Sequence, residues 1–205
     1  KRKIQNRNKQ IFEENIEFSL EKIGDFYSQT IIPNNNSIFR AYINGFYWLK
    51  SNSIDINHKN LGYYSDLQTD MVNYFKSLVI DWLNDNDNKN IIDKKIYPNI
   101  TGIKKDNYIE RLIIDISDIN RAPSNYYVEL FILSILIKDV PIRIIDNYNN
   151  LLYIFNNGLV YENLKPSDKI YKDFETLKFK KKSINIKYFL IGTNNVPYKL
   201  NVLYY

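Results

Sequence analysis

Few residues in this chain can act as nucleophile, general base or metal ligand. The sequence has no cysteine and a single histidine, His58. Disulfides, thiolate catalysis and cysteine-bound zinc are therefore excluded, as is a histidine-rich metal site. A serine–histidine couple would have to use His58, which lies among Asp55, Asn57 and Asn60, a setting typical of a solvated loop. We expect neither a metal nor a cofactor.

The stretch around Ser37 is the most informative for function. A turn signal, Pro33-Asn34-Asn35-Asn36, precedes Ser37, and an aromatic-rich apolar segment follows it over residues 38–49. This pattern predicts a buried helix that begins at a serine. Serine is a favoured N-cap residue, so capping of this helix is the plainest role for Ser37.

The same stretch resembles the nucleophile motif of ovarian-tumour (OTU) family cysteine proteases, which reads close to Pro-Asp-Gly-x-Cys-Leu-Phe-Arg-Ala. Pro33 and the run Phe39-Arg40-Ala41 agree with that motif, and Ile38 replaces its leucine. Three positions that matter for chemistry or for the turn differ: Asn34 replaces the aspartate, Asn35 the glycine and Ser37 the cysteine.

Further blocks follow in the order of the family and extend the resemblance over roughly residues 30–205. Leu67-Gln68, with Val72 and Tyr74, is similar to a family helix that begins Leu-Arg. Glu129-Leu130 with Leu133-Ser134, and then Pro141-Ile142-Arg143-Ile144, resemble a Glu-Leu-x-Ala-Leu-Ala helix running into a strand. Pro197-Tyr198 before Leu200 stands where the family has His-Tyr before its last strand.

The resemblance implies a catalytic site that has lost its reactive groups. In such proteases a helix N-terminus favours the thiolate, a histidine removes the thiol proton, and a polar residue orients the imidazole. The corresponding positions here are Ser37, Pro197 and Lys199, with Asn34 at the acidic position before the nucleophile. Proline has no titratable group, and a serine without a base is a poor nucleophile. We therefore expect no enzymatic activity.

The periodicity of apolar residues predicts the elements that would position these groups. Helical spacing marks residues 11–27, 38–49 and 127–137, and one helical face carries Leu67, Met71, Phe75, Leu78, Val79 and Trp82. Residues 84–90 read as a surface loop, and 140–145, 151–155, 184–191 and 200–205 as strands. This order predicts an α/β domain with a central sheet flanked by helices, and the resemblance implies a papain-like OTU fold. We expect a basic arm or linker at 1–10 and one domain at 11–205.

Charge and hydropathy bear on whether the chain binds nucleic acid or spans a membrane. The net charge is +5, with basic clusters near both ends of the chain. Such clusters attract anions, but a solvated tail explains them more simply, and they do not favour a nucleic-acid partner. The longest apolar stretch, residues 128–137, contains Glu129 and is too short to span a bilayer. We expect an intracellular protein, and the start at Lys1 suggests a piece of a longer one.

Four functions compete. The first is an inactive OTU-like module that binds a protein, with ubiquitin or a ubiquitin-like partner as the candidate and Tyr198, Trp48 and Tyr47 as candidate contact residues. The second is a structural or docking domain of a large toxin, effector or viral polyprotein. The third is an active hydrolase in which an engineered Ser37 replaces a catalytic cysteine. The fourth is a nucleic-acid binder that uses the terminal basic clusters.

Overall fold

A computed structural model gives the structure of the chain and describes residues 20–31, 36–50, 66–96, 98, 110, 126–179, 182–190 and 197–205. In this described part, seven strands form one sheet in the order β1-β2-β7-β6-β3-β4-β5. Strands β3 and β6 are parallel, and every other neighbouring pair is antiparallel. The strands are β1 Leu20–Ile23, β2 Phe26–Ile31, β3 Ile142–Ile145, β4 Leu151–Asn156, β5 Leu159–Glu162, β6 Ile184–Leu190 and β7 Pro197–Tyr204.

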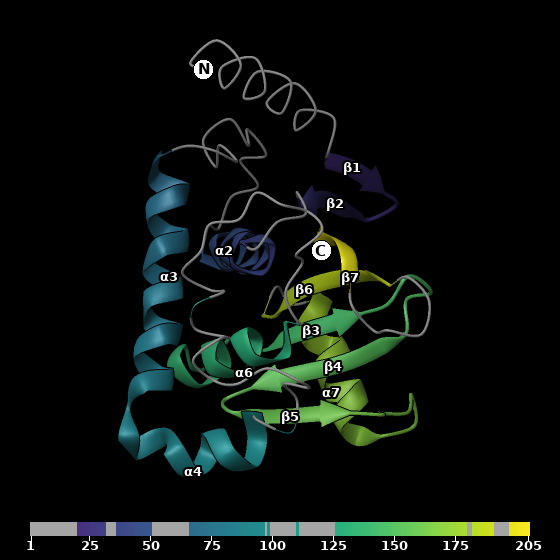
Figure 1. The fold of residues 1–205 in the computed structure, drawn as a ribbon. Helices are drawn as coiled ribbons and strands as arrows, with labels where there is room; N and C mark the ends of the chain where they lie inside the picture. The colour runs from purple at the N-terminus through teal and green to yellow at the C-terminus, as the bar shows by residue number, and fades with distance from the viewer. Residues whose placement is uncertain are drawn as a thin grey trace.

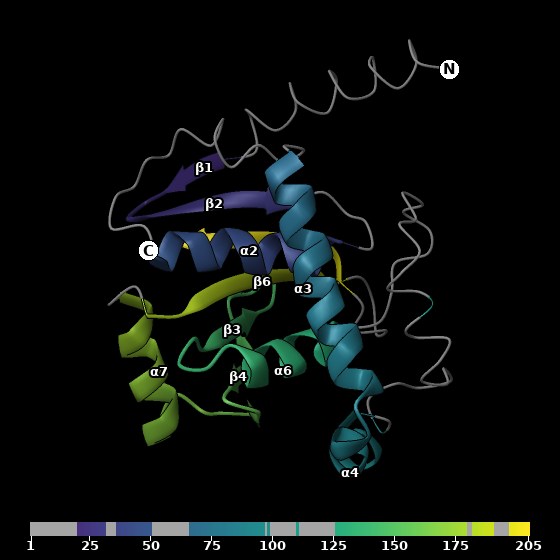
Figure 2. The ribbon, with the colours of Figure 1, turned by 90° about the vertical axis from the view of Figure 1, so that its left-hand side faces the viewer.

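Helices cover both faces of this sheet (Figures 1 and 2). Helices α2 (Ser37–Lys50) and α6 (Tyr127–Leu136) lie on one face, α3 (Asp66–Asn84) packs outside them, and α7 (Lys169–Phe179) lies on the opposite face. Short helical turns follow α3: η1 (Asn86–Asn88), α4 (Lys89–Ile91) and η2 (Ile92–Ile96).

The main core lies between the sheet and α2, α3 and α6. Alternate residues of a strand share a face, so Leu200, Val202 and Tyr204 of β7 all point toward α2. Helix α2 approaches β6 closely at Gly45, where the Cβ of any other residue would lie 2.6 Å from Cγ2 of Ile184. A side chain at this position would force either Ile184 or the helix to shift.

The expected α/β architecture with a central sheet and flanking helices is confirmed. The expected helices at 38–49 and 127–137 correspond to α2 and α6, and the apolar face between residues 67 and 82 belongs to α3. The predicted strands correspond to β3, β4, β6 and β7, and β6 and β7 are neighbours, with α2 packed on them. The expected arm at 1–10 lies outside the described residues.

Two local predictions were wrong. Residues 20–27, expected in a helix, form β1 and the start of β2, because Gly24 adopts a positive φ of 59° that closes a hairpin and β2 pairs with the distant β7. Residues 84–90 are not an irregular loop but contain η1 and most of α4. The side chain of Asp85 caps η1 by accepting from the backbone N–H of Asp87 at 3.0 Å.

Candidate functional site

The N-terminus of α2, where the resemblance places a nucleophile, is buried. The backbone N–H of Arg40 donates to the carbonyl of Asn36 at 2.9 Å, so Asn36 and not Ser37 is the N-cap residue. The expected capping role of Ser37 is therefore wrong by one position. Ser37 begins the helix and is only 1% exposed. The amide oxygen of Asn36 accepts a 3.1 Å hydrogen bond from the buried ammonium of Lys76.

Tyr126 covers Ser37. It precedes α6 with φ 56° and ψ 8°, a left-handed conformation that is uncommon for a bulky residue. This backbone places the phenol in the core, where it is hydrogen-bonded to the side chain of Ser37. The ring of Tyr126 meets that of Tyr188 of β6 edge-on, with centroids 6.2 Å apart. Strained residues cluster at functional sites, and here the strain holds a phenol over the nucleophile position.

The electrostatics keep these phenols neutral. Burial raises the pKa of Tyr126, the carboxylate of Glu129 raises it further, and the hydrogen bond with Ser37 opposes both. Burial also raises the pKa of Tyr188 well above its ordinary value, with Tyr126 and Glu129 adding to the effect. A neutral phenol cannot remove a proton from serine near pH 7. The immediate partner of the Ser37 hydroxyl is therefore not a general base.

Lys199, at the family's orienting position, lies on the other face of the sheet. Leu200 of β7 faces α2 with Tyr204, so Lys199 points away from Ser37. Its ammonium lies 4.9 Å from the ring centroid of Phe189. The backbone of Pro197 pairs with Leu190 in the sheet. The side chains of Pro197 and Tyr198 lie outside the described residues, as do Asn34 and His58.

The candidate contact residues Tyr47 and Trp48 lie at the far end of α2. At a rise of about 1.5 Å per residue they are roughly 15 Å along the helix axis from Ser37. The Tyr47 hydroxyl donates to Sδ of Met71 at 2.6 Å, and the Trp48 ring packs on Tyr204 with centroids 5.1 Å apart. Both residues are half-buried and serve the packing of α2. The structure does not bring them together with Ser37.

Sequence reasoning missed Lys76 and Tyr126. Lys76 interrupts the apolar face of α3, between Val72 and Val79 at helical spacing, and this position could have marked it as a buried cation. Tyr126 carried no such signal, because a positive φ at a tyrosine is imposed by the surrounding fold and not by the residue type.

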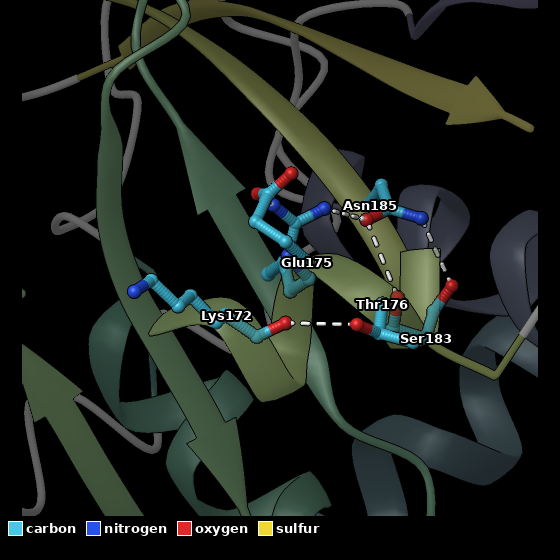
Figure 3. Close-up of polar contacts among 6 residues, drawn as sticks. Lys172, Glu175, Thr176, Ser183 and Asn185 are labelled. Atoms are coloured by element: carbon cyan, nitrogen blue, oxygen red, sulfur yellow. Dashed lines mark hydrogen bonds and ion pairs between the residues drawn. The ribbon is translucent and has the colours of Figure 1, made fainter. Parts of the chain in front are cut away.

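A second buried polar cluster lies beneath α7 (Figure 3). Arg143 of β3 is 3% exposed; it donates to Oδ1 of Asn185 at 2.7 Å and pairs with the carboxylate of Glu175. Ser183 also donates to Asn185, at 3.4 Å. Burial lowers the pKa of Arg143, and Glu175 opposes that shift. The cluster joins β3, β6 and α7, so its role in the fold is structural.

Comparison with known proteins gives one clear similarity. The chain is 36% identical over 200 residues to an uncharacterized protein of Acanthamoeba polyphaga mimivirus; the match covers 96% of this chain and 12% of that protein. The chain thus spans about an eighth of the length of this curated relative. No protein-family model matches the chain, and no solved structure does.

Two further properties concern the described residues alone. None of their helices is long and apolar enough to cross a membrane. Nor do they contain a group of histidine, aspartate or glutamate side chains that could hold a metal ion.

Proposed function

We propose that this chain is a catalytically inactive, OTU-like domain that binds a protein partner, with ubiquitin or a ubiquitin-like protein as the candidate. The observation that carries the proposal is the state of Ser37. The residue stands at the helix N-terminus that would hold a nucleophile, but it is 1% exposed and hydrogen-bonded to the phenol of Tyr126. A fold can persist after its catalytic residues are lost, because catalysis depends on the residues of the site and not on the fold.

The groups around Ser37 support inactivity over hydrolysis. A serine nucleophile needs a base within hydrogen-bond reach. Tyr126 is neutral, Lys199 lies on the other face of the sheet, and the histidine position of the family holds Pro197. An engineered exchange of cysteine for serine would account for Ser37 but not for Pro197.

The second candidate function is docking within a longer polypeptide. The match to a small part of a much longer viral protein favours this alternative. The domain would then contact other segments of the same protein and not ubiquitin. The two proposals differ in one measurable respect, which is whether the isolated chain binds ubiquitin.

The test is a titration of isotope-labelled chain with ubiquitin up to millimolar concentration, followed by NMR. We expect saturable shifts, at least fivefold weaker binding for Tyr198→Ala, and unchanged binding for Tyr74→Ala. Tyr74 is a suitable control because it is 59% exposed on α3. Absence of shifts at millimolar ubiquitin would reject the ubiquitin partner and leave docking within a longer polypeptide. Enlarging Ser37 is not a usable block of the site, because a bulky side chain there would disrupt the core.

A further inference from the structure

The sheet face away from α2 carries two lysines that flank one aromatic ring. Phe189 of β6 and Lys199 of β7 are paired neighbours in the sheet, and Lys187 lies two residues before Phe189 on the same face. The Lys187 and Lys199 ammonium groups lie 5.6 Å and 4.9 Å from the centroid of the Phe189 ring. The two ammonium groups are therefore at most about 10.5 Å apart.

Neutral groups hold both lysines in place. Lys187 donates to the amide oxygen of Asn149 at 2.8 Å, and Phe189 contributes cation–π attraction to both. Among the described residues neither ammonium is paired with a carboxylate. The carboxylate of Asp146, in the adjacent turn, accepts three hydrogen bonds within that turn: from the backbone of Tyr148 and Asn150 and from the side chain of Asn150. Within the described ranges no carboxylate thus neutralises the positive charge of the two lysines, and this charge attracts anions.

An exposed aromatic residue lies in the same turn as Asn149, the hydrogen-bond acceptor of Lys187. Tyr148, at the tip of the turn between β3 and β4, is 80% exposed. Hydrogen bonds hold the turn, because Asp146 accepts from the Tyr148 backbone at 2.8 Å and Asn147 accepts from the Leu190 backbone of β6 at 3.1 Å. An Asx-type turn of this kind presents its tip residue on a rigid support. Tyr148, Lys187, Phe189 and Lys199 together form what we call the lysine–aromatic patch.

We infer that the lysine–aromatic patch binds single-stranded nucleic acid. Proteins that bind single strands without sequence preference combine cations that track the phosphates with aromatic rings on which the bases stack. Lys187 and Lys199 supply cations within a span of at most about three nucleotides, given about 3.4 Å of axis per nucleotide of one strand. Tyr148 supplies the exposed ring. This activity is independent of the proposed protein partner and of Ser37, which lies on the opposite face of the sheet.

A single strand fits the patch better than a duplex or an acidic peptide does. The bases of a duplex are stacked on one another and offer no free face to Tyr148. An acidic peptide would satisfy the lysines but would gain little from an exposed ring beside them. The terminal basic clusters did not predict this site, because Lys187 and Lys199 are isolated in the sequence and meet only through the pairing of β6 with β7.

The test is fluorescence anisotropy with labelled oligothymidylate of about 12 nucleotides, within the usual site size of single-strand binders. The variants are Tyr148→Ala and the double variant Lys187→Gln/Lys199→Gln. The matched controls are Tyr74→Ala and Lys172→Gln, which alter an exposed tyrosine on α3 and an exposed lysine on α7. Poly-glutamate and the corresponding duplex serve as competitors.

We expect Tyr148→Ala to weaken binding by about fivefold to 100-fold, the range for loss of one stacked base. The double lysine variant should weaken binding and reduce the slope of log K against log salt by about 1.4, since each phosphate contact in a single strand contributes about 0.7. The controls should bind like the parent protein, and the duplex should compete poorly. Equal binding by the patch variants and the parent would overturn the inference. Competition by poly-glutamate as strong as by the oligonucleotide, with no effect of Tyr148→Ala, would overturn it in favour of an acidic protein.

Discussion

The hydroxyl of Tyr42 is predicted to destabilise the fold. Tyr42 lies in the middle of α2, is fully buried, and packs its ring against Phe46 and Phe75 with centroids 6.1 Å and 5.5 Å away. Its hydroxyl oxygen has no hydrogen-bond partner in the part of the chain that the structure describes. Burial of an unsatisfied polar group costs about 1–3 kcal/mol, and removal of the oxygen leaves the ring packing intact. We expect Tyr42→Phe to raise the free energy of unfolding by about 1–2 kcal/mol.

Tyr204→Phe provides the matched control. Tyr204 is equally buried, but its hydroxyl donates to the side-chain oxygen of Gln29, which also accepts from Asn44 at 3.1 Å. Loss of this bond should lower the free energy of unfolding by about 1 kcal/mol. The assay is urea unfolding at pH 7 followed by circular dichroism, with both variants expected to keep the parent slope m. If Tyr42→Phe destabilises the protein as much as Tyr204→Phe does, the Tyr42 hydroxyl is satisfied and the reasoning fails.

Three further predictions address packing, charge and pH. Gly45→Ala should destabilise the protein by about 1–3 kcal/mol in urea unfolding, because the added methyl group would clash with the buried side chain of Ile184; a neutral result would show that α2 can shift on the sheet. Glu175→Ala should cost about 3 kcal/mol in the same assay, because the buried charge of Arg143 loses its partner, and a loss below about 1 kcal/mol would show that Asn185 alone suffices. Burial raises the pKa of Tyr188, so its stabilising effect is complete below the unfolded pKa of about 10 and declines as pH rises above that value. The free energy of unfolding should be flat from about pH 7 to 9 and then fall by up to about 1.4 kcal/mol per pH unit for each such tyrosine, whereas an unchanged value at about pH 11 would contradict this.

Local periodicity predicted those parts of the fold in which local and tertiary preferences agree. The helices α3 and α6 could be predicted from the sequence, because α3 buries its apolar face and α6 buries its continuous apolar run. The strands β1 and β2 could not be predicted in this way, because the apolar residues 16, 20 and 23 have helical spacing. Only pairing with the distant β7 makes β2 a strand. α7 and β5 were missed because α7 has a mostly polar sequence and β5 is a short edge strand of four residues.

The sequence predicted where the candidate site lies but not that it is closed. The motif around Ser37 located the start of a buried helix, and α2 begins there. The closure of that site by Tyr126 depends on a left-handed backbone conformation that no residue pattern predicted. The lysine–aromatic patch depends on the register of β6 and β7, which brings Lys199 opposite Phe189, and register is not readable from either strand alone.

The central claim is that the nucleophile position is closed and has no base, and a single-thiol experiment tests it most directly. Because the chain has no cysteine, Ser37→Cys introduces one thiol at a defined place. An electrophilic ubiquitin probe and di-ubiquitin of several linkages should give no adduct and no cleavage with this variant, and the parent chain should likewise cleave nothing. A small alkylating reagent should label Ser37→Cys only after unfolding, but should label Ser77→Cys, at an exposed position on α3, in the native state. Formation of a probe adduct at residue 37 in the native protein would contradict the account.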